Sequence, residues 1–184
     1  MKRCLALVLS ALLGVASLPV LAADTVPHDP VALHQQLDTY LFDAARAGDT
    51  AILAEFIANG YDLDRQDAKG YTALILAAYN GHKAAVSQLL AAGANPCVED
   101  KRGNTALLGA IFKGEVAIAR LLMAADCATN HRNHAGQTPA MYAALFQRAE
   151  ILEELRRRGA DMDARDAAGN TLQGLARGQF AGQR

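Results

Sequence analysis

Serine is nearly absent from this chain beyond its first 22 residues, where Ser87 is the only one. No G-x-S-x-G motif surrounds Ser87, and the sequence has no phosphate-binding G-x-x-x-x-G-K-[ST] loop, no H-E-x-x-H and no G-x-G-x-x-G after a predicted strand. Most aspartates fall in predicted turns, where hydrogen bonds from the side chain to the backbone account for them. Because no catalytic constellation is present, we expect neither enzymatic activity nor a cofactor.

Positive charge is also sparse beyond residue 22, where 16 basic residues face 19 acidic ones, giving a formal charge of about −3. The one dense basic run is Arg156–Arg158. It ends a predicted helix, where cations complement the negative end of the helix dipole. Proteins that bind phosphate backbones usually present a basic stripe, so we expect no nucleic-acid partner.

The N-terminal segment has the pattern of a secretory signal peptide. Lys2 and Arg3 precede an apolar run that extends to Leu21, and Val20-Leu21-Ala22 supplies a boundary with small residues. We predict cleavage after residue 22 and a periplasmic location. An uncleaved membrane anchor is the alternative, but Gly14, Ser17 and Pro19 interrupt the run and favour cleavage. No later segment is long and apolar enough to span a bilayer, so we expect no stable membrane insertion after cleavage.

A motif recurs along the rest of the chain with a period of 33 residues. Asp67, Asp100, Asn133 and Asp166 are each followed three residues later by glycine and five residues later by threonine. The glycine permits a backbone with φ > 0 in a turn, and the threonine is a good N-cap for a following helix. In the central unit we expect helices over about 73–80 and 83–92, separated by Gly81.

This period, with its G-x-T motif, paired alanines, central glycine and closing G-A-[DN], resembles the ankyrin repeat family. The resemblance implies an all-α solenoid of helix-turn-helix units joined by β-hairpin-like loops, with about four repeats and a C-terminal half-repeat cap. The expected organisation is a signal peptide (1–22), a flexible lead-in (23–32), an ankyrin repeat domain (33–178) and a tail (179–184). The units of the repeat domain are 34–66, 67–99, 100–132, 133–165 and 166–178.

Several positions depart from the family pattern. Ile75, Leu108 and Met141 replace the histidine that often follows the helix-opening threonine, so we expect buried apolar contacts there in place of its hydrogen bonds. Gln147 stands where other units have the inter-helix glycine, and we expect a different turn. Asp126 stands where other units have the glycine that closes the second helix, which we expect to cost about 1 kcal/mol in a left-handed backbone.

Four residues with metal-ligand chemistry fall near the ends of the third unit: Cys97, Cys127, His131 and His134. Their spacing matches no standard zinc pattern. Core packing of the cysteines, a disulfide between them and a metal site all remain open. They are the only cysteines left after signal cleavage, and a bridge requires their Cα atoms to lie within about 7 Å.

The family resemblance implies a non-catalytic module that binds a protein partner through its concave face, made of loop tips and first-helix ends. We expect the chain to be a monomer. Aromatic residues and arginines are common interface hot spots, although Phe112, Leu145 and Phe146 would also serve to fill gaps between repeats. The predicted partner-binding residues are Arg46, Lys69, Tyr71, Tyr79, Asn80, Lys101, Arg102, Asn104, Phe112, Lys113, Gln137, Leu145 and Phe146.

The resemblance to signal-bearing bacterial ankyrin proteins also implies a role in the envelope. Some of these proteins support protection against stress, including support of catalase against peroxide, and others inhibit toxic effectors. We rank stress support first and inhibition or immunity second. A redox or metal sensor that uses Cys97 and Cys127 is a third hypothesis, which thiol counting distinguishes from plain binding.

Overall fold

The computed structural model describes residues 30–125, 127 and 129–181. The predicted signal segment, most of the predicted lead-in and Asp126 lie outside these residues. The chain divides into two compact units, Met1–His34 and Gln35–Arg184. Of the first unit, the described residues 30–34 form the start of one helix.

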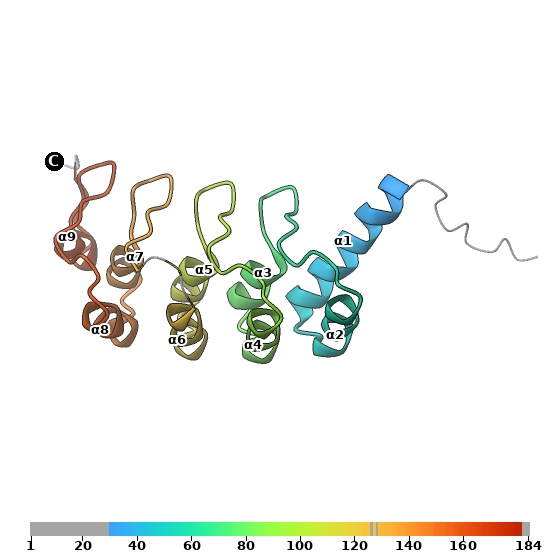
Figure 1. Ribbon diagram of the computed structural model, residues 1–184. Coiled ribbons are helices and arrows are strands. Elements are labelled where there is room, and N and C mark those ends of the chain that lie inside the picture. The colour runs from blue at the N-terminus through green and yellow to red at the C-terminus, as the bar shows by residue number, and fades with distance from the viewer. Residues whose placement is uncertain (1–29, 126, 128, 182–184) are drawn as a thin grey trace, which may run out of the picture. The chain divides into compact units, whose positions relative to one another are not determined.

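Helices account for most of the described residues, and no extended strand is present among them (Figure 1). Their bounds are α1 Pro30–Ala47, α2 Thr50–Ala58, α3 Ala73–Tyr79, α4 Lys83–Ala91, α5 Ala106–Lys113, α6 Val116–Ala124, α7 Pro139–Leu145, α8 Ala149–Arg157 and α9 Leu172–Ala176. The predicted helices of the central unit are confirmed to within one residue at each end. None of the helices in the described ranges is long and apolar enough to cross a bilayer.

Helix α1 begins at Pro30, so the prediction that the lead-in stays unstructured up to residue 32 is wrong for its last three residues. Proline suits the first position of a helix because the amide hydrogen that it lacks would have no partner inside the helix. Two prolines in a short polar stretch suggested an extended chain, whereas the second of them begins a helix.

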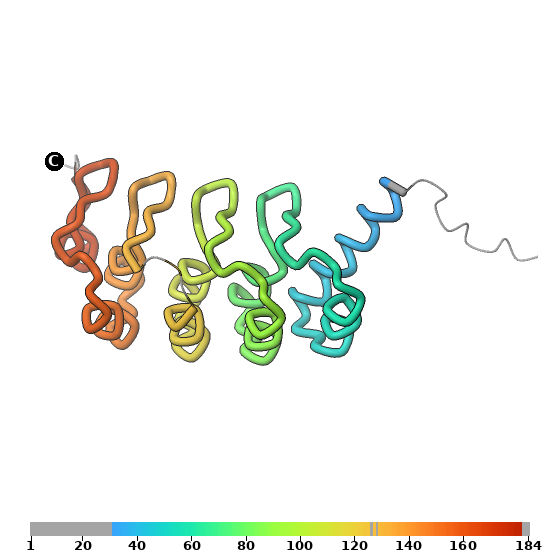
Figure 2. Tube along the Cα trace, viewed as in Figure 1, coloured from blue at the N-terminus to red at the C-terminus, as the bar shows by residue number. Residues whose placement is uncertain are grey.

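The helices of the second unit form two rows (Figures 1 and 2). Helices α3, α5, α7 and α9 contact one another in sequence, and α2, α4, α6 and α8 form the second row. Small side chains let these rows approach closely, since Ala77, Ala110 and Ala143 have no exposed surface. The side chains that replace the family histidine are buried as predicted: Ile75, Leu108 and Met141.

Long loops project from the same side of the helix rows (Figure 2). The carboxylate of Asp67 accepts hydrogen bonds from the backbone N–H groups of Lys69 and Tyr71, at 2.8 and 2.9 Å. Neighbouring loops are joined by backbone hydrogen bonds, such as that from Lys101 N–H to the Lys69 oxygen at 3.0 Å. Gly70 is required at this contact, because a Cβ atom there would lie 2.7 Å from the Lys101 nitrogen. The loops are therefore held in register from repeat to repeat.

A polar cluster joins α1 to the segment after α2. Asp38 accepts hydrogen bonds from the Tyr61 hydroxyl at 2.8 Å and from Arg65 Nη2 at 2.6 Å. Burial, together with the nearby Asp38 carboxylate, raises the pKa of Tyr61 to about 12. The first unit, 34–66, is thus stabilised by side-chain contacts that are not part of the repeat motif.

Gln147 adopts the left-handed backbone that glycine has in the other units, with φ of 55°. Arg148 N–H donates to the Ala143 oxygen at 2.7 Å, as His82 N–H donates to the Ala77 oxygen at 3.0 Å after α3. The expectation of a different turn is therefore wrong, because the hydrogen bonds of the turn impose the same backbone on glutamine.

Gln147→Gly is expected to raise the free energy of unfolding by about 1 kcal/mol, since glycine adopts this backbone without steric cost. Gln147 is exposed, so its side chain contributes little packing. Chemical denaturation measures the change. Gly159→Ala is the matched control, because Gly159 has φ of 80° and a Cβ added there would meet no atom within 4 Å, so its free energy of unfolding should fall by a similar amount. A destabilised Gln147→Gly protein would contradict this account.

Candidate interaction surface

The loop tips and the ends of the first-row helices form one surface, which we call the tip face. It comprises residues 68–71, 101–104 and 134–137 with Arg46, the C-terminal ends of α3 and α5, and Phe146 after α7. A hollow of about 220 Å³ lies in its middle. The hollow is lined by Tyr71, Ile75, Tyr79, Asp100, Arg102, Asn104, Thr105, Leu108, Gly109, Phe112, Tyr142 and Phe146.

Aromatic rings from successive repeats contact one another on this face. The rings of Tyr79 and Phe112 stack with centroids 5.9 Å apart and planes at 10°. Phe146 meets Phe112 edge to face at 4.8 Å and Tyr142 at 5.5 Å. Tyr79 and Phe112 nevertheless stay 43% and 39% exposed. These two rings therefore fill the gap between repeats and also present apolar surface outward.

Polar groups also line the same hollow. The Tyr142 hydroxyl donates to Asn104 Oδ1 at 3.3 Å and accepts from Asn133 Nδ2 at 3.4 Å. Burial raises the pKa of Tyr142, with a further contribution from the negative charge of Asp100. The hydroxyl therefore stays protonated and orients the amide of Asn104 at the edge of the hollow.

A second hollow, of about 510 Å³, lies toward α1. The predicted residues Arg46, Lys69 and Asn80 line it together with Tyr71 and Tyr79. Arg46 is held by ion pairs, with Asp43 at 2.8 Å and Asp67 at 3.1 Å. Its guanidinium is therefore fixed in place at the end of α1.

The remaining predicted residues are placed differently. Lys113 lies over the Tyr79 ring with its Nζ 5.1 Å from the centroid, and Lys101 is exposed on its loop. Gln137 is half-buried and accepts a hydrogen bond from Asn133 at 3.2 Å.

Leu145 packs on the cluster of Met141, Ala164 and Leu175 and lines neither hollow, so the structure does not support its assignment to the binding surface. Leu145 was inferred from its repeat position, which is equivalent to those of Tyr79 and Phe112, but the capping helix α9 covers that side of α7.

Tyr142 also lines the hollow, although it was not among the predicted binding residues. Its signal was its spacing: it precedes Phe146 by four residues, which places both on one face of a helix. Ile75 and Leu108 were predicted as core residues and are buried, at 5% and 0% exposure, although they also border the hollow.

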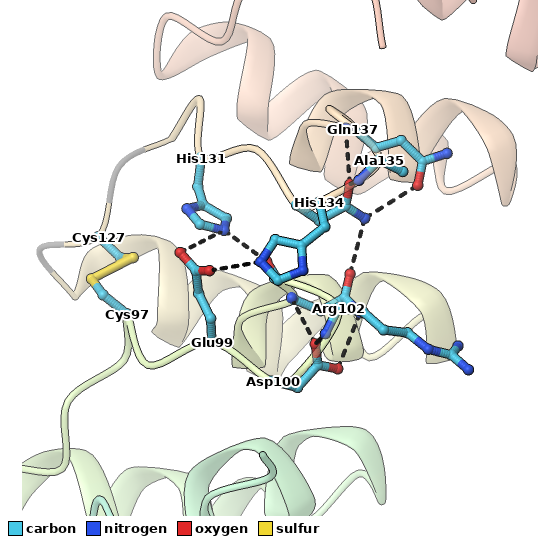
Figure 3. A network of polar contacts seen from close by, with 12 residues as sticks. Cys97, Glu99, Asp100, Arg102, Cys127, His131, His134, Ala135 and Gln137 are labelled. Atoms are coloured by element: carbon cyan, nitrogen blue, oxygen red, sulfur yellow. Dashed lines mark hydrogen bonds and ion pairs between the residues drawn. A yellow bond between two sulfur atoms is a disulfide. The ribbon is translucent and has the colours of Figure 1, made fainter. Parts of the chain in front are cut away.

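Cys97 and Cys127 form a disulfide in the structure, with Cα atoms 5.5 Å apart (Figure 3). The separation lies within the limit for a bridge. The two residues follow the second helices of adjacent repeats, so the bond links the end of one repeat to the end of the next. In this state neither cysteine offers a thiolate to a metal.

Two histidines lie beside this bridge (Figure 3). His131 Nε2 is 2.9 Å from the Gly103 backbone oxygen and 3.7 Å from Glu99, and His134 Nε2 is 3.8 Å from Glu99. At the equivalent position of the neighbouring units, Gln66 and Arg132 donate to the glycine carbonyl of their own loop. Glu99 carries no such donor, and His131 supplies it from the next repeat. Among the described residues, no three histidine, cysteine or acidic side chains are grouped to hold a metal.

The basic run at the end of α8 is paired with acidic residues of its own helix. Arg156 bonds Glu153 at 2.8 Å, and Arg157 and Arg158 bond Glu154 at 2.6 and 2.8 Å. Hydrogen bonds from Arg156 and Arg158 lower the pKa values of Glu153 and Glu154 respectively. The run is thus accounted for by local ion pairs at a helix end.

Comparison with known proteins agrees with this architecture. The family model for ankyrin repeats, in its three-copy form, matches residues 41–133 and 89–166. No curated protein matches the chain. Proteins built from this repeat are generally non-catalytic scaffolds for protein–protein interaction. The two rows of helices, the 33-residue period and the matched residues together show that the chain belongs to the ankyrin repeat family.

Proposed function

We propose that this protein is a non-catalytic interaction module of the bacterial envelope that binds a protein partner through the tip face. The observation that carries the proposal is the row of contacting rings formed by Tyr79, Phe112 and Phe146. Monomeric proteins rarely leave contiguous aromatic surface in contact with water without a binding role. Rigid, partly exposed aromatic rings are also the side chains that most often dominate the energy of an interface.

Capture from an osmotic-shock extract tests the proposal. The mature wild-type protein should retain a partner, and the Tyr79→Ala/Phe112→Ala variant should lose it. Ile52→Ala is the matched control, because Ile52 is as exposed as Tyr79, at 43%, but lies on α2 in the other row. Equal capture by all three proteins would overturn the proposal.

The envelope location rests on the basic start, the apolar run and the Val20-Leu21-Ala22 boundary. Export is expected to remove 22 residues and leave a chain that starts at Ala23. Intact-mass measurement of protein from the osmotic-shock fraction checks this. A full-length species that starts at Met1 and stays in the cytoplasm would be the contrary result.

Within the envelope we propose a supporting role in protection against peroxide stress, based on resemblance to signal-bearing ankyrin proteins. Inhibition of a toxic effector is the alternative, and the identity of the captured partner separates the two. A catalase or another stress enzyme supports the first role. A toxin domain supports the second.

Redox sensing is a second candidate function, favoured by the disulfide between Cys97 and Cys127. A sensor requires that the bond open within the range of potentials that the envelope experiences, with an effect on partner binding. Thiol counting on protein taken directly from cells, with and without reductant, measures the oxidised fraction. A bond that is always oxidised, with partner binding that reductant does not change, would eliminate the sensor.

A further inference from the structure

The tip face has an unusual balance of charge. The segments that form most of it, 67–80, 100–113 and 133–146, contain two acidic residues, Asp67 and Asp100, and four basic ones. The basic residues are Lys69, Lys101, Arg102 and Lys113. The chain beyond residue 22 has a formal charge of about −3, so the tip face is positive while the rest of the protein is negative.

Both acidic side chains accept hydrogen bonds from groups of their own loops. Asp100 is buried, and its carboxylate accepts hydrogen bonds from Arg102 N–H at 2.7 Å and from Asn104 N–H and Nδ2 at 2.9 and 3.1 Å. Asp67 makes the equivalent backbone contacts and pairs with Arg46. Both carboxylates are therefore engaged by hydrogen bonds within the loops, and that of Asp67 is also paired with a cation.

Three of the basic side chains, by contrast, are exposed and can contact a partner. The side chains of Lys69, Lys101 and Arg102 are exposed, and among the described residues none of them forms an ion pair. Arg102 extends away from the loop in Figure 3, on the side opposite Glu99. It also lines the aromatic hollow, so positive charge and apolar surface meet at one place.

The size of that hollow limits what enters it. Small-molecule sites commonly enclose about 300–1,000 Å³, which exceeds the roughly 220 Å³ here. The hollow suits one large apolar side chain of a partner, packed against the exposed rings of Tyr79 and Phe112.

We propose that the tip face recognises an acidic segment of a partner protein that carries an aromatic or large aliphatic side chain. That side chain enters the aromatic hollow, and flanking carboxylates contact Arg102, Lys101 and Lys69. Opposite charge steers such a segment to this face and excludes basic segments. The inference rests on the proposed function and specifies the chemistry of its partner.

Fluorescence anisotropy with defined peptide pools tests it on the mature chain. The first pool holds fluorescein-labelled 15-residue peptides rich in Glu and Asp with a central Phe, Trp or Leu. A second pool replaces the acids by Lys, and a third replaces the central residue by Ala. The acidic pool with the apolar centre should bind about tenfold or more tightly than either other pool, and higher salt should weaken that binding. Equal or undetectable binding of this pool would overturn the inference.

Charge reversal supplies a matched pair of variants. Arg102→Glu should weaken binding of the first pool by about fivefold or more, while Lys83→Glu, an exposed cation on α4, should change it less than about twofold. Circular dichroism melting checks that both variants fold. Equal effects of the two changes, or tighter binding of a fluorescent oligo-dT 15-mer than of the acidic pool, would count against an acidic protein segment.

The outcomes separate this inference from the proposed function. If a captured partner depends on Tyr79 and Phe112 but the acidic and basic pools bind alike, the binding face stands and the acidic specificity fails. If capture does not depend on those rings and no pool distinguishes Arg102→Glu from Lys83→Glu, both fail.

Discussion

Replacing Cys97 and Cys127 by alanine is expected to lower the free energy of unfolding by roughly 3.5 kcal/mol, because the bond closes a loop with a sequence separation of 30 residues. The local backbone explains why the bond matters. After α4, Ala94 N–H donates to the Leu89 oxygen, whereas after α6 Cys127 N–H donates to Ala125. The helix-end hydrogen bond of the other repeats is thus missing here, and the disulfide holds this segment.

Denaturation with and without reductant measures this effect. Reductant should lower the midpoint of the wild-type protein to about that of the double alanine variant and should leave the variant unchanged. A wild-type protein whose midpoint does not move with reductant, although its thiols become reactive, would show that the bond contributes nothing to stability.

A double change of Tyr79 and Phe112 to alanine is expected to weaken partner binding by well over tenfold. Each hot-spot ring costs roughly 2 kcal/mol or more when it is truncated. Stability should fall by only about 1 kcal/mol, the value of an aromatic contact, because both rings are more than a third exposed. Calorimetric titration with the captured partner gives the affinity, and thermal melting gives the stability.

Ile52→Ala controls for the loss of exposed apolar surface on the same protein. It should leave the affinity for the partner within about twofold of wild type, because α2 belongs to the other row of helices. A large loss of melting temperature in the Tyr79→Ala/Phe112→Ala variant, with binding intact, would place these rings in the core.

The repeat architecture was predictable because its cues are local. Turn aspartates, positive-φ glycines and helix-capping threonines recur at fixed spacing, and Thr72 and Thr138 accept the expected hydrogen bonds from Ile75 and Met141 N–H. Thr105 occupies the same position, but its side chain accepts no capping hydrogen bond. The residue type at Gln147 led to the wrong prediction of a different turn, because hydrogen bonds across the turn impose a left-handed backbone there.

The candidate site was only partly predictable, because it depends on contacts between repeats. Four large side chains recur at one pair of repeat positions, Tyr79, Phe112, Leu145 and Phe146, and the structure brings the three rings together. The same rule failed for Leu145, since it does not tell which side of α7 the C-terminal cap covers. The cysteine pairing also depended on a three-residue offset between repeats, whose effect on distance follows only from coordinates.

Photo-crosslinking in living cells tests the tip-face assignment most directly. The full chain would carry p-benzoylphenylalanine at position 79 or 112 on the tip face, or at position 52 or 91 on the other row, where the native residues are also exposed. The account predicts one covalent adduct with the same partner from positions 79 and 112 and none from 52 or 91. Adducts from positions 52 and 91, with none from 79 and 112, would contradict it.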